Sequence, residues 1–228
     1  MTAPRSILII GASRGLGLGL AGEFAAQGWA VTATVRSAAQ QAPLQALPGV
    51  RVEQLEMTDP DSLDQLANRL SGQQFDVIFV NAGVAGPEHH STAQASAEEM
   101  GQLFLTNAVA PLRVAERLLP NLAAEHGLIV FMSSILGSIE AGAGLGMPLY
   151  GASKAALNHL VQCFVRTQDN PHLGVVLMHP GWVRTDMGGA DAPLDIDSSC
   201  KGMVEQVSSA VGQPGLRYLD FEGNPLPW

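Results

Sequence analysis

A tyrosine and a lysine stand four residues apart in a chain that has very few of either. Its tyrosines are Tyr150 and Tyr218, and its lysines are Lys154 and Lys201. The segment 150–154 opens a stretch with helical periodicity, and residues i and i+4 of a helix share a face. We therefore predict that the Tyr150 phenol and the Lys154 ammonium point into the same space, where the pair can exchange a proton with a substrate.

A glycine-rich turn near the N-terminus has the sequence context of a phosphate-binding loop. The apolar run 7–10 is typical of a buried parallel strand, and helical spacing of apolar residues begins at Leu16. Between them lies Gly11-x-x-x-Gly15-x-Gly17. Glycines permit a tight turn, and a helix N-terminus offers free N–H groups to a pyrophosphate. A glycine turn without a ligand is the alternative, because the commoner spacing is Gly-x-Gly-x-x-Gly.

The residues after the second predicted strand, 30–35, indicate which dinucleotide the turn would bind. An acidic residue at this place binds the ribose 2′-hydroxyl of NAD. Here Arg36 follows the strand instead, and Arg14 lies in the first loop. Guanidinium groups form charge-assisted bonds with phosphate, which favours NADP(H) over NAD(H). The alternative is that Arg36 is only a solvated loop residue.

Apolar strand patterns and helical patterns alternate along the whole chain. The predicted strands are 7–10, 30–35, 50–55, 75–80, 127–132, 174–178 and 216–219, and the main later helices are 96–119, 152–168 and 198–211. Pro111 is expected to bend the first of these helices or to shift its register. Because no hairpin signal interrupts this order, we predict one domain over residues 1–228. Its fold class is α/β, a Rossmann-type doubly wound parallel sheet of about seven strands with helices on both faces.

The residues suited to chemistry cluster on one predicted edge of that sheet. Ligands bind beyond the carboxyl ends of the strands in such folds. Gly11, Asn81, Ser134 and Pro180 each follow a predicted strand, and Tyr150 enters its helix from the same side.

Composition and charge exclude several classes of partner. Net charge is −9 and no basic run occurs, so we expect neither nucleic acid nor an anionic membrane as partner. No apolar run reaches the ~18 residues of a membrane span, and the start of the chain lacks a signal-peptide pattern. Cys163 and Cys200 fit no metal or disulfide pattern, which favours a reducing cytoplasm. His89-His90 lack a further ligand, so we predict a surface loop and no metal.

With these residues in place, the chain resembles the short-chain dehydrogenases/reductases, and most closely the branch of C-factor/Sniffer-like carbonyl reductases. The family motifs, in order, are Gly11-x-x-x-Gly15-x-Gly17, Asn81-Ala82-Gly83, Asn107, Ser134, Tyr150-x-x-x-Lys154 and Pro180-Gly181. The branch is indicated by residues 179–189, by 153–158 and by the ending Leu226-Pro227-Trp228. Glu56 stands where the family usually has Asp, and the interval from Ser134 to Tyr150 is longer than usual.

The resemblance implies a catalytic set and a cofactor-binding set. The catalytic residues would be Asn107, Ser134, Tyr150 and Lys154, with Ser133 as the alternative to Ser134. The cofactor would contact Gly11, Ser13, Arg14, Gly15, Leu16, Gly17, Arg36, Glu56, Met57, Asn81, Ala82, Gly83, Tyr150, Lys154, Pro180, Gly181, Val183 and Thr185. It further implies a homodimer or homotetramer.

The implied activity is NADPH-dependent reduction of an aldehyde, ketone or quinone-like carbonyl, with Tyr150 as general acid. Ser134 would bond the developing alkoxide, Lys154 would hold the nicotinamide ribose, and Asn107 would steady a water. Two alternatives remain open. One is a cofactor-binding signalling or regulatory protein with little turnover, and the other is a dehydratase or epimerase on the same fold.

Overall fold

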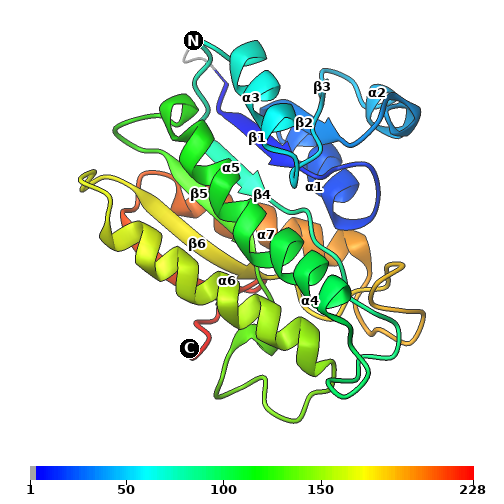
Figure 1. Ribbon diagram of the computed structural model, residues 1–228. Coiled ribbons are helices and arrows are strands. Elements are labelled where there is room, and N and C mark those ends of the chain that lie inside the picture. Colours follow the sequence, from blue (N-terminus) through cyan, green and yellow to red (C-terminus); the bar gives the residue numbers. More distant parts are fainter. Residues whose placement is uncertain (1–3) are drawn as a thin grey trace.

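A seven-stranded parallel sheet in the order β3-β2-β1-β4-β5-β6-β7 forms the centre of the computed structural model (Figure 1). The structure describes residues 4–228; residues 1–3, which belong to the segment where we found no signal-peptide pattern, lie outside the described part. The strands are β1 (Ser6–Ile10), β2 (Ala30–Val35), β3 (Arg51–Gln54), β4 (Val77–Val80), β5 (Leu128–Met132), β6 (Gly174–His179) and β7 (Gly215–Asp220). All six neighbouring pairs are parallel, which confirms the predicted fold class.

Helices cover both faces of the sheet. They are α1 (Gly15–Ala26), α2 (Ala42–Gln45), α3 (Pro60–Arg69), α4 (Ala97–Phe104), α5 (Ala110–Leu118), α6 (Pro148–Arg166) and α7 (Ile196–Ala210). In Figure 1, α4, α5 and α6 lie in front of the sheet and α7 lies behind it. Within residues 4–228, no helix combines the length and apolar character required to cross a membrane.

The central strands β1, β4, β5 and β6 are apolar on both sides because each side meets a separate core. Leu8 and Ile10 of β1 pack with α3, α5 and α6, whereas Ile7 and Ile9 pack with α1 and α7. Alternate residues of a strand point to opposite faces, so a doubly covered strand needs a continuous apolar run. This is the physical reason why the strand patterns could be read from the sequence.

The helical pattern at 96–119 is divided into three segments. A π-helical turn at Leu105–Val109 separates α4 from α5, and Pro111 lies in the first turn of α5. A π turn shifts the helical register, as we predict for Pro111, and it lies just before that residue. The π turn contains Asn107, which is fully buried.

Helix α6 begins four residues before the predicted start at 152. Pro148 occupies its first position, where a preset φ and a missing N–H cause no loss. The preceding Met147 has a left-handed backbone, with φ of 48°. Tyr150 therefore lies inside the first turn of α6 and shares its rigid frame with Lys154.

Replacing a large core side chain of a central strand tests this description of the fold. Phe131 of β5 is fully buried in the core beneath α5 and α6. Phe131→Ala should lower the free energy of unfolding by about 3–5 kcal/mol, because apolar burial is lost and a cavity remains. Urea unfolding measures this value. Leu145→Ala, at a largely exposed leucine, is the control and should change stability by less than about 0.5 kcal/mol.

Candidate active site

Tyr150 and Lys154 face one another above the carboxyl end of β5. The Lys154 ammonium nitrogen lies 5.7 Å from the centre of the Tyr150 ring. The same nitrogen donates a hydrogen bond of 2.8 Å to the backbone oxygen of Met132, the last residue of β5. Lys154 is only 2% exposed. The predicted convergence of phenol and ammonium is therefore present, with the lysine buried rather than at the surface.

Burial shifts the pKa values of this pair in opposite directions. Burial raises the pKa of Tyr150 to about 12, and a hydrogen bond with the Ser134 side chain opposes that rise. Burial lowers the pKa of Lys154 to about 8. We expected Lys154 to stabilise the phenolate, but in the protein alone desolvation of both groups outweighs their attraction. At neutral pH the phenol holds its proton, which is the state a proton donor needs.

The two serines after β5 have different surroundings. Ser134 lies beside Tyr150, and its Oγ accepts a hydrogen bond of 3.2 Å from the backbone N–H of Leu136. Ser133 points elsewhere and donates a 2.6 Å hydrogen bond to Oδ1 of Asn158. Of the two alternatives left by the sequence, the geometry places Ser134 at the phenol.

Asn107 is held by hydrogen bonds on both sides of its amide. Its oxygen accepts from the N–H of Val84 at 2.9 Å, and its NH₂ group donates to the Val84 oxygen and to Oγ of Ser153. Ser153 in turn donates to the backbone oxygen of Tyr150 at 2.7 Å. The side chain of Asn107 thus links α6 to the segment after β4. This places Asn107 next to the Tyr150 helix but commits its side-chain NH₂ group to structure.

The glycine turn and the Asn81-Ala82-Gly83 segment are packed against each other. A Cβ atom on Gly11 would lie 2.6 Å from Cβ of Ala82, and one on Gly17 would lie 2.1 Å from the Gly11 oxygen. The Asn81 side chain donates a 2.6 Å hydrogen bond to that same oxygen. A side chain at Gly83 would meet Lys154 Nζ at 3.4 Å. The segment after β4 therefore joins the glycine loop to the catalytic candidates.

The N-terminus of α1 fits an anionic group. Arg14 is the residue before the helix and provides no side-chain cap, and the first turn, from Gly15, has no acidic residue. The free N–H groups there and the helix dipole favour a phosphate. Ser13 and Leu16 flank this position and are half-buried. The residues present thus match the pyrophosphate site that the spacing predicted.

Arg36 is exposed just beyond β2, beside the glycine turn. The preceding Thr34 accepts a 3.0 Å hydrogen bond from the N–H of Gly11. Arg14 has a different partner in this structure, because it forms an ion pair with Asp186. Both members of that pair are largely exposed, so the pair is weak and a phosphate can compete for Arg14.

The segment after β6 closes over the glycine loop. A cleft of about 600 Å³ lies between them and is lined by Arg14, Gly15, Arg184, Thr185, Asp186, Gly189, Ala190 and Ile196. Thr185 is held by its own loop, where its Oγ1 accepts from the N–H of Gly188 at 3.1 Å. Pro180 is fixed by Ser199, which donates to the Pro180 oxygen at 2.6 Å, and Val183 is buried. Gly181 has φ of 83°, where its Cβ would meet Leu194 at 2.9 Å.

Two predicted cofactor residues have other roles in this structure. The Glu56 carboxylate accepts hydrogen bonds from the N–H and hydroxyl of Thr58, at 3.1 and 2.8 Å. Met57 is 5% exposed and belongs to the core next to α3. Their side chains are therefore committed within the protein, and any cofactor contact from Met57 would come from its backbone.

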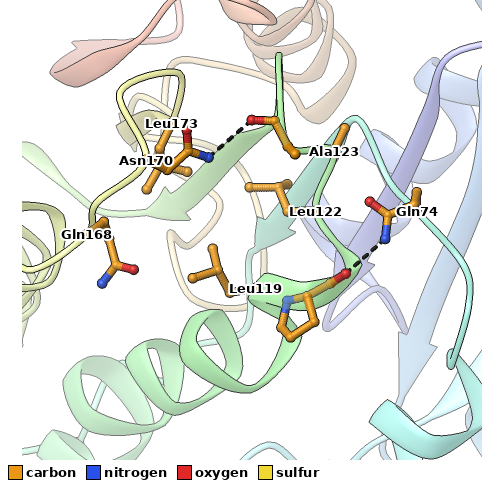
Figure 2. Close-up of a pocket in the computed structure, with 9 residues that line it drawn as sticks. Gln74, Leu119, Leu122, Ala123, Gln168, Asn170 and Leu173 are labelled. Carbon is orange, nitrogen blue, oxygen red and sulfur yellow. Dashed lines mark hydrogen bonds between the residues drawn. The ribbon is translucent and has the colours of Figure 1, made fainter.

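A second pocket, of about 370 Å³, lies at the amino ends of the strands, away from Tyr150 (Figure 2). Its lining residues are Gln74, Leu119, Pro120, Leu122, Ala123, Ala124, Gln168, Asn170 and Leu173, none of which is ionisable. The side chains of Gln74 and Asn170 donate to the backbone oxygens of Pro120 and Ala124. The pocket thus offers no group for acid–base or nucleophilic chemistry.

Several residues around the site belong to no motif that predicts their role. Asp186 pairs with Arg14, Ser153 bonds Asn107, and Tyr218 donates to the backbone oxygen of Ser134. Tyr218 carried a usable signal, because it is the second of two tyrosines in the chain. Within residues 4–228 no group of three or more His, Cys, Asp or Glu side chains is arranged to hold a metal.

Fold and site together define a dinucleotide-binding α/β protein with a serine, tyrosine and lysine at the carboxyl edge of its sheet. The chain belongs to the short-chain dehydrogenase family, whose sequence model matches residues 5–193. A carbonyl reductase of Pseudomonas aeruginosa PAO1, solved in complex with NADP, is 40% identical with a TM-score of 0.90. That match covers 99% of this chain and all of the other.

Two further relatives confirm the predicted branch. The carbonyl reductase Sniffer of D. melanogaster is 31% identical with a TM-score of 0.88, over 99% of this chain and 100% of that structure. The C-signal protein of Myxococcus xanthus is 35% identical over 154 residues, which are 67% of this chain and 92% of the relative.

Cofactor selection at Arg36 can be tested directly. Arg36→Ala should raise the Kd for NADPH roughly tenfold or more and leave that for NADH nearly unchanged, because only the former carries a 2′-phosphate. Fluorescence titration of both cofactors gives the two constants. Arg113→Ala, an exposed arginine on α5, is the control. An equal rise in the Kd values of NADPH and NADH would mean that Arg36 does not contact the 2′-phosphate.

The buried lysine should give the protein a specific pH dependence of stability. Because the pKa of Lys154 falls to about 8 in the folded protein, the unfolded chain binds one more proton between that value and the ordinary 10.5. Stability should therefore rise with pH from about 8 to 9.5, by about 1.4 kcal/mol per unit, relative to Lys154→Met. Urea unfolding of both proteins across this range measures the slope. Parallel curves would show that Lys154 is ordinarily solvated.

Proposed function

We propose that this protein is an NADPH-dependent carbonyl reductase that converts an aldehyde, ketone or quinone-like substrate to an alcohol. The observation that carries the proposal is the placement of the Tyr150 phenol. It lies beside the Ser134 hydroxyl and the Lys154 ammonium, at the same sheet edge as the glycine turn. The carbonyl reductases of P. aeruginosa and D. melanogaster that resemble this chain support this reaction class.

The cofactor is NADP(H). The uncapped N-terminus of α1 receives the pyrophosphate, and Arg36 and Arg14 recognise the 2′-phosphate. Thr185 reaches the glycine loop from the segment after β6, since its methyl group would lie 3.8 Å from a Cβ on Gly15. The P. aeruginosa carbonyl reductase was solved with NADP, which supports the same choice here.

The reaction divides between the cofactor and the protein. NADPH supplies the hydride that the carbonyl carbon accepts. Tyr150 donates its phenolic proton to the carbonyl oxygen, so that carbon and oxygen together gain a hydride and a proton. Ser134 donates a hydrogen bond to that oxygen as negative charge develops; its proton is available because its Oγ accepts, rather than donates, at Leu136.

Lys154 contributes its positive charge to the same step. Its nitrogen lies over the Tyr150 ring, so the ammonium stabilises the phenolate that remains after proton transfer. Asn107 positions the helix by its link through Ser153 to the backbone of Tyr150. Both roles depend on geometry that the chain alone provides.

The surface around the site favours substrates with apolar substituents. Among residues 4–228 the large hydrophobic side chains that remain exposed are Val84, Ile139, Leu145, Trp182, Met187 and Trp228. The first five follow β4, β5 or β6, and the last contacts the segment after β5. Exposed apolar side chains gathered at one edge are typical of a binding site for an apolar molecule.

A second candidate function is a cofactor-binding regulatory protein with little turnover. The similarity to the C-signal protein favours it. Titration with NADPH together with a panel of aldehydes, ketones and quinones separates the two functions. Tight cofactor binding without NADPH consumption across the panel would select the regulatory role.

The proposal extends to the assembly and location of the protein. We propose a homodimer or homotetramer formed through the helices that carry Asn107 and Tyr150. Cys163 and Cys200 are both free thiols, in accord with a reducing cytoplasm. Light scattering on the purified chain measures the oligomer.

Removal of the phenolic hydroxyl tests the mechanism. Tyr150→Phe should lower kcat by about 10²- to 10⁴-fold, because it removes only the proton donor. The Kd for NADPH should stay within about twofold, which serves as the internal control for folding. The steady-state rate of NADPH oxidation with an aldehyde as substrate gives kcat, and detection of the alcohol confirms the product. Turnover close to that of the unaltered protein would disprove the proposed role of Tyr150.

A further inference from the structure

The second tyrosine of the chain reaches the site from the far edge of the sheet. Tyr218 lies on β7 and is 3% exposed. Its hydroxyl donates a short hydrogen bond to the backbone oxygen of Ser134. A buried phenol has one proton to donate, and here that proton is directed at the residue whose side chain lies beside Tyr150.

A network of buried side chains holds the same segment from the other side. Ser133 donates to Oδ1 of Asn158 at 2.6 Å, and the Asn158 NH₂ group donates to the backbone oxygen of Gly137 at 3.2 Å. Hydrogen bonds with Asn158 and Ser133 also act on the Tyr218 hydroxyl. Residues 133–137 are thus fastened to both α6 and β7.

The last residue extends this attachment into the loop that follows. The Trp228 ring packs on the Tyr218 ring, with centroids 5.6 Å apart. The Trp228 backbone oxygen accepts from the N–H groups of Ile139 and Glu140, at 3.1 and 3.3 Å, and from Oγ of Ser138. The backbone N–H of Leu226 donates to the backbone oxygen of Tyr218 at 2.8 Å and fixes the path of the tail. Tyr218 therefore joins the segment at Ser134 to the tail.

We propose that Tyr218 is a positioning residue, which sets the Ser134 hydroxyl relative to the Tyr150 phenol by holding the Ser134 backbone. The proposal rests on the carbonyl reductase function proposed above. Ser134 needs such support because it lies outside β5, in a segment that continues into a long loop. A hydrogen bond to its backbone restricts the peptide and leaves the side chain free to meet the substrate.

The protonation states of the two phenols agree with this role. Burial raises the pKa of Tyr218, opposed by hydrogen bonds with Asn158 and Ser133, so its hydroxyl is neutral and donates throughout the neutral range. Burial is the main reason why the pKa of Tyr150 is raised, and repulsion between the two phenols in their ionised forms adds to it. The charged group facing Tyr150 from α6 is Lys154. Tyr218 thus acts through geometry and takes no proton from the substrate.

Tyr218→Phe is the variant that isolates the hydroxyl, because the ring can still pack on Trp228. We expect kcat to fall about tenfold, with the Kd for NADPH unchanged, since a small displacement of a catalytic group lowers the rate without affecting cofactor binding. In a Ser134→Ala background the same change should alter kcat by less than twofold. Such non-additivity arises only when Tyr218 acts through Ser134.

A matched control separates positioning from general loss of stability. Asn121 is buried near the amino ends of the strands, and its NH₂ group donates to the backbone oxygens of Leu70 and Gln73. Asn121→Ala should destabilise the protein and leave kcat unchanged. If Tyr218→Phe and Asn121→Ala lower kcat alike, or if the Tyr218→Phe effect is the same with and without Ser134, the positioning role is wrong.

Hydrogen–deuterium exchange tests the positioning role of Tyr218 without relying on carbonyl reductase activity. Tyr218→Phe should increase the rate of amide exchange in residues 134–140 at least fivefold. The exchange rates of strands β4 and β5 should stay unchanged. If the unaltered protein reduces no carbonyl, the proposed function fails, and exchange alone decides whether Tyr218 holds Ser134. Unchanged exchange at 134–140 would overturn the positioning role even in an active enzyme.

Discussion

The burial of a single ammonium group organises this site. Lys154 carries its charge into a position that is 2% exposed, with one hydrogen bond to the end of β5. Burying a charged group is expensive unless other groups compensate. The segments of the polypeptide around Lys154 approach it closely only where they carry no side chain, and glycines occupy these positions. A Cβ on Gly137 would lie 2.9 Å from Cβ of Lys154, and one on Gly83 would lie 3.4 Å from its Nζ.

The same burial explains why the protein alone leaves its tyrosine protonated. Desolvation acts on both members of the pair, raising the pKa of Tyr150 and lowering that of Lys154. A positive charge that is itself costly to keep stabilises a neighbouring phenolate only modestly. The positively charged nicotinamide ring of an oxidised cofactor would stabilise the phenolate further.

The sequence predicts the parts of this structure that depend on local pattern. The central strands are covered on both faces and need continuous apolar runs, so β1, β4, β5 and β6 were found close to their bounds. The sequence fails where long-range packing decides. Pro111 signals an irregularity in residues 96–119, but the bonding of the Asn107 side chain to Val84 and Ser153 cannot be read from that segment. The pairing of Arg14 with Asp186 is equally invisible, because the two are far apart in the chain.

The long interval between Ser134 and Tyr150 shows how distant segments replace local restraint. A loop of this length would leave Ser134 poorly fixed if only its own sequence held it. Its first part is instead bonded to the Trp228 backbone, and its beginning to the Tyr218 hydroxyl. Added loop length costs little free energy once both ends are anchored. The geometry of the catalytic candidates can therefore stay constant while the middle of the loop, around the exposed Leu145, is free of these restraints.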